Sequence, residues 1–348
     1  FQDPRRPPAG FWYYSTYENR KVPWKFEDTT RWLLRNKILP GYVSAESDPA
    51  IRAILPPKPT LSNGGHLTFE QAVPAEKYYA AHPEYYPLID GIRIRPTGHD
   101  KGQRRAQLCV SNPEVKRLVT EYILRFTREN PEHIFRMGAA DAPDMWCRCP
   151  DCVRMGMGSD GKFRTTNLYH KFYSEISSEV LKKNPDAKLY VYIYLDYRDL
   201  PTVPIQYDDR VMGCYCAHGR CIAHPLDDPS CEMNHKFLRE YIAWKKILKR
   251  TSLGDYYFNS NVPYCPHEYV FAADMGTRMK RGDDAYGTHM TPFRIYTNWQ
   301  FIYTIARMNW APALDVDALM EDVYSRYYGK ASGPMKKYHS MRKELWKN

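Results

Sequence analysis

The sequence lacks the features that mark several large classes of protein. No apolar run approaches the roughly 20 residues that a helix needs to span a bilayer. The basic residues are dispersed, and no helix-turn-helix, zinc-finger or RNP-like pattern is present. The chain also lacks internal repeats, low-complexity linkers and a glycine-rich phosphate loop. We therefore expect no membrane span and no nucleic-acid partner.

The composition is that of a large folded domain rich in tyrosine. The 348 residues are 43% hydrophobic and include 29 tyrosines. Tyrosine can be half buried and still form a hydrogen bond, which suits carbohydrate clefts and also protein interfaces. The formal net charge of +10 fits either simple solubility or an anionic partner such as an acidic or sulfated glycan.

Strand-like and helix-like runs alternate along the chain, which is typical of an α/β fold with parallel strands. Asn112-Pro113-Glu114 predicts a helix start, since Asn is a favoured N-cap residue and Pro a favoured first residue. We expect a (β/α)8 TIM-barrel-like fold with long decorated loops; a doubly wound open sheet is the alternative. One domain is expected over 1–348, with the barrel core at 10–330 and a basic helical tail at 331–348. Strands are expected at 11–15, 66–69, 134–140, 188–195, 210–214, 253–258 and 285–290, and helices at 26–38, 74–81, 113–129, 167–183, 234–248, 299–308 and 316–327.

The segment 135–152 carries the densest chemistry. A predicted strand is followed by Asp141 and Asp144, two acids close enough in sequence for one to act as a proton donor. The alternative is that these acids cap the turn after the strand. Trp146 can offer a flat apolar face to a sugar ring, or it can anchor the loop.

Three cysteines, Cys147, Cys149 and Cys152, complete this segment. A structural zinc site would need a fourth ligand, for which Cys214, Cys216, Cys221 and His224 are the candidates. A disulfide or free buried thiols are the alternatives. The total of nine cysteines is odd, so they cannot all pair within the chain.

Further polar residues follow other predicted strands. Tyr194 and Asp196 come at the end of one strand, and Asp255, Tyr256 and Asn259 at the end of a later one. At the carboxyl ends of barrel strands such residues line active sites. A salt bridge between strand and loop is the alternative for Asp255.

Several motifs together resemble an uncharacterised bacterial family, the DUF4838-type family. They are residues 82–91 and 107–115, the Asp-then-Trp-Cys-x-Cys-x-x-Cys segment, Cys221-Ile-Ala-His-Pro-Leu226, and residues 310–319 with 327–331. That family resembles α-glucuronidase-like glycoside hydrolases and the endo-β-N-acetylglucosaminidases of family 163. Many members carry an acid after the seventh strand, where this chain has His289.

The resemblance implies a glycoside hydrolase that acts on an amino-sugar-containing or acidic glycan and requires no cofactor. We assign Asp144 as general acid and Asp141 as its stabilising partner, with His66 and His289 among the substrate-binding residues. If the sugar carries a 2-acetamido group, its own carbonyl can act as nucleophile. The alternatives are a catalytically silent carbohydrate-binding barrel or structural subunit, and a metal-dependent enzyme that uses the Cys/His segments.

The resemblance also implies an extracytoplasmic location, which is secreted, periplasmic or cell-surface. The chain begins at Phe1 and has no signal peptide, so we expect it to be part of a longer multidomain protein.

Overall fold

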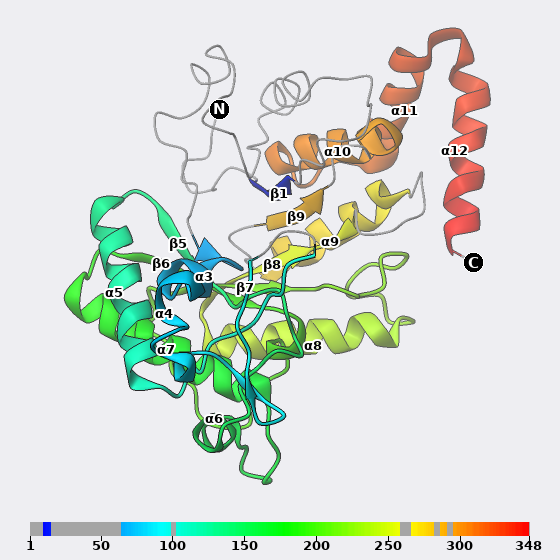
Figure 1. The fold of residues 1–348 in the computed structure, drawn as a ribbon. Helices are drawn as coiled ribbons and strands as arrows, with labels where there is room; N and C mark the ends of the chain where they lie inside the picture. The colour runs from blue at the N-terminus through cyan, green and yellow to red at the C-terminus, as the bar shows by residue number, and fades with distance from the viewer. Residues whose placement is uncertain are drawn as a thin grey trace. The chain divides into compact units, whose positions relative to one another are not determined.

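The computed structural model describes residues 10–14, 64–98, 102–257, 266–281, 286–290 and 295–347 (Figure 1). The chain divides into two compact units. We call one the four-cysteine unit; its described residues are 64–98, 102–216 and 240–251. The other is the Arg220 unit, whose described residues are 10–14, 217–239, 252–257, 266–281, 286–290 and 295–347.

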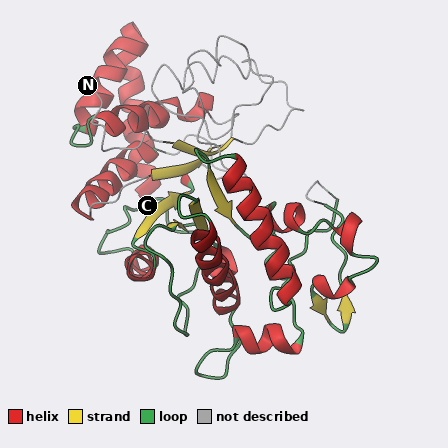
Figure 2. Ribbon diagram, turned by 90° about the vertical axis from the view of Figure 1, so that its left-hand side faces the viewer, coloured by secondary structure: helices red, strands yellow, loops and turns green. Residues whose placement is uncertain are grey.

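Four parallel strands form the sheet of the four-cysteine unit, in the order β7-β6-β5-β2. Their bounds are β2 (Gly64–Gly65), β5 (Ile134–Met137), β6 (Lys188–Ile193) and β7 (Met212–Cys216). Helices run alongside these strands (Figure 2). The helices are α3 (Thr68–Ala72), α4 (Ala75–Tyr78), α5 (Pro113–Glu129), α6 (Pro150–Gly156) and α7 (Thr165–Lys183), with the short 3-10 helices η1 (Pro83–Tyr85) and η2 (Leu195–Tyr197) and the hairpin β3 (Leu88–Ile89) and β4 (Ile92–Arg93).

Helix α5 begins where the sequence predicts. The Asn112 side chain accepts hydrogen bonds from the backbone N–H groups of Glu114 (2.9 Å) and Val115 (3.3 Å), and Pro113 fills the first turn. These bonds satisfy donors that a helix start otherwise leaves without partners. The helix packs against α7, α3 and β5.

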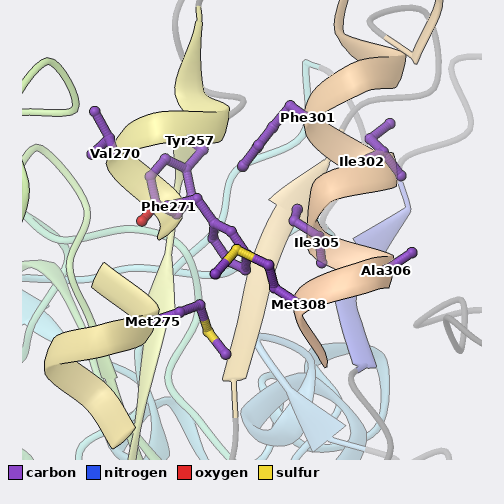
Figure 3. Close-up of a cluster of buried hydrophobic side chains, with 9 residues drawn as sticks. All are labelled: Tyr257, Val270, Phe271, Met275, Phe301, Ile302, Ile305, Ala306 and Met308. Carbon is purple, nitrogen blue, oxygen red and sulfur yellow. The ribbon is translucent and has the colours of Figure 1, made fainter. Parts of the chain in front are cut away.

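The Arg220 unit has a smaller parallel sheet, in the order β1-β9-β8. Helix α8 (Glu232–Ile247) and strand β8 (Arg250–Asp255) each contribute residues to both units. The core of the Arg220 unit is formed by Tyr257, which follows β8, and by apolar side chains of α9 and α10 (Figure 3). Its remaining elements are β1 (Gly10–Tyr14), α9 (His267–Arg281), β9 (Tyr286–Met290), α10 (Ile295–Trp310), α11 (Val316–Tyr328), η5 (Gly329–Ala331) and α12 (Ser332–Lys347).

The expectation of an α/β fold with parallel strands is confirmed, but a closed eight-stranded barrel is not found. Within the described residues the parallel strands number four in one unit and three in the other. The expectation of a single domain over 1–348 stays a prediction. No described helix is long and apolar enough to cross a membrane.

One local prediction is wrong, and one helix was not predicted. In the segment expected as a strand at 66–69, residues 66–67 form a turn and 68–69 begin helix α3, because strand β2 ends at Gly65, whose φ of +68° turns the chain. Helix α9 was not expected at all. The helix expected at 26–38 lies outside the described residues.

Candidate functional site

The carboxyl ends of β2, β5 and β6 lie side by side at one edge of a parallel sheet, since β5 pairs with both of the other strands. Five of the predicted site residues directly follow these strands. They are His66 after β2, Asp141 and Asp144 after β5, and Tyr194 and Asp196 after β6. In open α/β sheets this edge is where ligands bind.

Two glycines allow His66 to approach β5 closely. Gly65 has a φ of +68°, a conformation that costs glycine little, and a Cβ on Gly138 would lie 2.6 Å from the Gly65 carbonyl oxygen. The His66 Nδ1 atom then lies 2.9 Å from the carbonyl oxygen of Ala139. Its ring stacks on Tyr192, with centroids 6.0 Å apart and planes 5° apart. The half-buried imidazole is therefore held in one orientation at the sheet edge.

Asp196 is the acid in this group whose environment favours proton transfer. Burial raises the pKa of its carboxyl from 3.8 to about 7, although the indole N–H of Trp146 donates to Oδ2 at 2.6 Å; the charge of Asp144 raises the pKa further. The preceding residue, Leu195, has a φ of +44°, which is a strained conformation for a side chain of that kind. Such strain gathers at functional sites.

Trp146 does not serve as a sugar platform in this structure. It is only 1% exposed, and its ring makes edge contacts with Tyr169 and Tyr197, each with centroids 6.1 Å apart. No face of the indole is therefore open to a pyranose ring. Its role is instead that of a buried hydrogen-bond donor to Asp196.

Asp141 and Asp144 are both exposed. The Asp141 carboxylate pairs with Arg105 at 3.3 Å. Because both side chains are about 40% exposed, this pair contributes little to stability.

A hollow of about 20 Å³ lies beside Arg105, which forms part of its wall. Neither Asp141 nor Asp144 lines it, and it has room for about one water molecule. The rest of its wall comes from Phe69, Glu70, Val73, Ala75, Glu76, Pro96, Gly98, Ala106 and Leu108.

Four buried cysteines gather beside the same loop. We call Cys109, Cys147, Cys149 and Cys152 the four-cysteine cluster; all four Sγ atoms lie within 4.8 Å of one another. The Sγ atom of Cys109 lies 3.6 Å from that of Cys149 and 3.9 Å from that of Cys152. These distances exclude a disulfide, whose sulfurs are about 2.05 Å apart. The eight cysteines that the structure describes are all free thiols. The cluster can bind a metal ion.

Backbone and side-chain donors surround the sulfurs. The N–H of Leu88 donates to Cys147 (3.3 Å), the N–H of Cys149 to Cys147 (3.5 Å) and the N–H of Cys152 to Cys149 (3.5 Å). The Ser111 hydroxyl lies 3.0 Å from the Cys152 sulfur. Such contacts orient metal-binding thiolates and offset their negative charge.

Without a cation, these thiols oppose one another's ionisation. The thiols of Cys147 and Cys152 hydrogen-bond to Cys109 and lower the pKa of its thiol. The same hydrogen bond to Cys109 is the largest cause that raises the pKa of Cys147, to about 12. The hydrogen bonds therefore favour the thiolate form of Cys109 and the thiol forms of Cys147 and Cys152. A bound divalent cation would remove this conflict, because it stabilises all four thiolates together.

The prediction that Cys214, Cys216, Cys221 or His224 supplies the fourth ligand of this cluster is wrong. Cys109 fills that place, 38 residues before Cys147 in the chain. Cys214 and Cys216 lie on β7 with their sulfurs 3.7 Å apart. Cys221 and His224 belong to a second group in the Arg220 unit.

The site residues expected after the later strand lie in the Arg220 unit. Asp255 is 1% exposed and forms a buried ion pair with Arg220, with 2.9 Å between Oδ1 and Nε. It is therefore a structural residue in this structure, as the salt-bridge alternative predicts. The Tyr256 ring makes an edge contact with His218. Asn259 and the side chain of His289 lie outside what the structure describes.

The protein is therefore an α/β protein with parallel strands. It has a candidate site of acidic and aromatic residues at the carboxyl ends of β2, β5 and β6, and a buried four-cysteine cluster. The chain belongs to the DUF4838 family, a domain of unknown function whose model matches residues 13–340. A comparison with curated proteins found no match.

Proposed function

We propose that this protein is a glycoside hydrolase that acts on an amino-sugar-containing or acidic glycan, with Asp196 as its general acid. The observation that carries the proposal is the half-buried Asp196 carboxyl, which the Trp146 indole holds at the carboxyl end of β6 beside the acids that follow β5. A pKa near 7 leaves this carboxyl partly protonated at neutral pH, as proton donation to a leaving oxygen requires.

This assignment moves the acid role from Asp144 to Asp196. The charge of Asp144 acts on Asp196, so Asp144 and Asp141 would be the acids that stabilise positive charge as the glycosidic bond breaks. A substrate with a 2-acetamido group would need only one protein acid and one orienting carboxylate. One half-buried acid beside exposed acids fits that requirement.

We propose zinc as the ion of the four-cysteine cluster, in a structural role. Tetrahedral zinc with Zn–S bonds of 2.3 Å places sulfurs about 3.8 Å apart. The two Sγ distances from Cys109, 3.6 and 3.9 Å, lie on either side of that value. Four buried thiolates leave no position open for substrate, so this zinc would hold the loop and take no part in bond cleavage.

A glycan panel with product analysis tests the activity. The panel contains N-glycans and uronic-acid polysaccharides. The parent protein should cleave at least one member, with turnover that falls as the pH rises above about 7 because the acid must be protonated. Asp196→Asn should lose turnover by about 10²-fold or more and keep binding.

The matched control is Asp186→Asn. Asp186 is exposed and precedes the same strand, β6, so it lies at the opposite edge of the sheet. This variant should retain full turnover. Equal turnover in the parent and in Asp196→Asn would end the assignment of Asp196.

A catalytically silent carbohydrate-binding module is the second candidate. The exposure of Asp141 and Asp144 to solvent favours it, because exposed carboxylates are weak groups for bond cleavage. Binding of a glycan by the parent without any cleavage would establish this function. For either function, we propose a location outside the cytoplasm, which cell fractionation of the source organism can test.

A further inference from the structure

A second set of metal-ligand side chains lies in the Arg220 unit. We call Cys221, His224 and Cys231 the Cys–His–Cys group; their ligand atoms lie within 4.8 Å of one another. The Cys221 sulfur is 3.1 Å from the Nδ1 atom of His224. Cys221 and His224 are half-buried, and Cys231 is buried. Among the described residues, the group contains only these three metal-binding side chains.

We propose that the Cys–His–Cys group binds a zinc ion through three protein ligands and leaves the fourth position to an exchangeable water or small anion. Two thiolates and one imidazole are a ligand set that zinc accepts with an open position. Tetrahedral bonds to sulfur and nitrogen would place Cys221 Sγ and His224 Nδ1 about 3.6 Å apart. The observed 3.1 Å requires the pair to open by about half an ångström to admit the ion.

The loop that carries two of the ligands is fixed by a buried network. The Asn234 side-chain N–H₂ donates to the carbonyls of Cys221, His224 and Pro225, each at 3.0 Å. Arg220 donates to the same carbonyls of Cys221 (3.0 Å) and His224 (3.3 Å). Both ligand residues are therefore clamped through their own backbone oxygens, which orders the site before any ion arrives.

The clamp is itself anchored. The Arg220 guanidinium pairs with Asp255 at 2.9 Å and with Asp274 at 2.6 Å, and all three side chains are 0–2% exposed. Asp274 also accepts from the N–H of Leu226, in the same loop, at 2.6 Å. Arg220 thus acts as a positioning residue for the group. This site does not depend on the proposed hydrolase activity, which we place in the other unit.

Zinc content of the purified full chain tests the proposal. After loading with zinc and desalting, the parent should hold about two ions, one for each group. His224→Ala should lose one of them, and His224→Cys should keep it because a thiolate replaces the imidazole. The matched control is His235→Ala, a histidine of the same unit outside the group, which should keep both. A zinc content equal to that of the parent in His224→Ala would overturn the proposal.

A measurement on the unmodified chain covers the case in which His224→Ala fails to fold. Zinc should protect Cys221 and Cys231 from alkylation, and a chelator should expose the half-buried Cys221, as mapped by mass spectrometry. Alkylation of Cys221 that is the same with and without zinc would refute the proposal, as would a Cys221–Cys231 disulfide in the zinc-loaded chain.

The open position has its own readout. With cobalt in place of zinc, the absorption bands of the Cys–His–Cys group are those that are missing from the His224→Ala variant. Azide should shift these bands, because an anion can replace water at an ion with three protein ligands. The four-thiolate centre offers no such position. A spectrum that azide leaves unchanged would refute the exchangeable ligand.

Discussion

Replacement of Asp196 by asparagine should make the protein more stable at alkaline pH. Burial raises the pKa of the carboxyl from 3.8 to about 7, so the folded state holds a proton that the unfolded state has released. The contribution of this carboxyl to the free energy of unfolding of the parent therefore falls as the pH rises from about 4 to about 7. Above pH 7 this contribution is constant.

The size of the effect follows from the pKa difference. A shift from 3.8 to about 7 corresponds to a ceiling of about 4 kcal/mol, at 1.36 kcal/mol per pKa unit. Solvent reaches this half-buried carboxylate and reduces the difference, so we expect roughly 2 to 4 kcal/mol at pH 8. Asparagine can still accept from the Trp146 indole through its amide oxygen, so the hydrogen bond is kept while the buried charge is lost.

Urea unfolding of Asp196→Asn and of the parent, between pH 4 and pH 9 at fixed ionic strength, measures this difference. The advantage of the variant should be small at pH 4, grow through pH 7 and then stay constant. Asp186→Asn removes an exposed acid near the other end of β6 and should show no such growth. A difference between Asp196→Asn and the parent that is the same at every pH would refute the reasoning.

Three further outcomes follow from other buried groups. Cys109→Ser should lose one zinc equivalent and lower the melting temperature, because the ion stabilises only the folded state. Burial lowers the pKa of His170 to about 3, so the parent should lose up to about 5 kcal/mol of stability as the pH falls from 6.5 to 3; His170→Gln should not show that loss in urea titrations. Arg220→Met should cost about 3 to 5 kcal/mol, because Asp255 and Asp274 would keep buried charges without a cation beside them.

These outcomes have matched controls. Arg210→Met removes a surface arginine whose pair with Asp208 is exposed, and it should cost no more than about 1 kcal/mol in the same urea titration. Cys231→Ser, in the other metal-ligand group, should leave the zinc of the four-cysteine cluster bound. An Arg220→Met variant as stable as Arg210→Met would contradict the buried ion-pair argument.

Local signals allowed several elements to be predicted from the sequence. Helix α5 follows from Asn112 and Pro113, because an N-cap and a first-turn proline act on their own backbone neighbours. The strand expected at 66–69 is wrong for a similarly local reason, since β2 ends at Gly65, whose φ of +68° turns the chain before helix α3 begins. Alternation of polar and apolar residues over four positions does not separate these two outcomes.

The fourth cysteine of the cluster could not be found from local spacing, because long-range contacts bring it into place. The Gln107 side chain donates to the carbonyls of Ala140 (2.8 Å) and Ala142 (2.9 Å) and accepts from the N–H of Ala140 (2.9 Å). This side chain ties the segment before α5 to the loop after β5. Cys109 thereby comes to lie beside Cys149. Periodicity and motif spacing carry no information about such a contact.

The thiol cluster and the candidate acid are physically connected through two adjacent residues. Cys147 belongs to the cluster, and the preceding residue, Trp146, holds the Asp196 carboxyl through its indole N–H. An ion that fixes the Cys147 sulfur also fixes the backbone from which the indole projects. The raised pKa of Asp196 depends on burial, and the buried indole is its hydrogen-bond partner. The proposed zinc ion, even without an open coordination position, would therefore act on the proposed acid indirectly, through the loop that carries both Cys147 and Trp146.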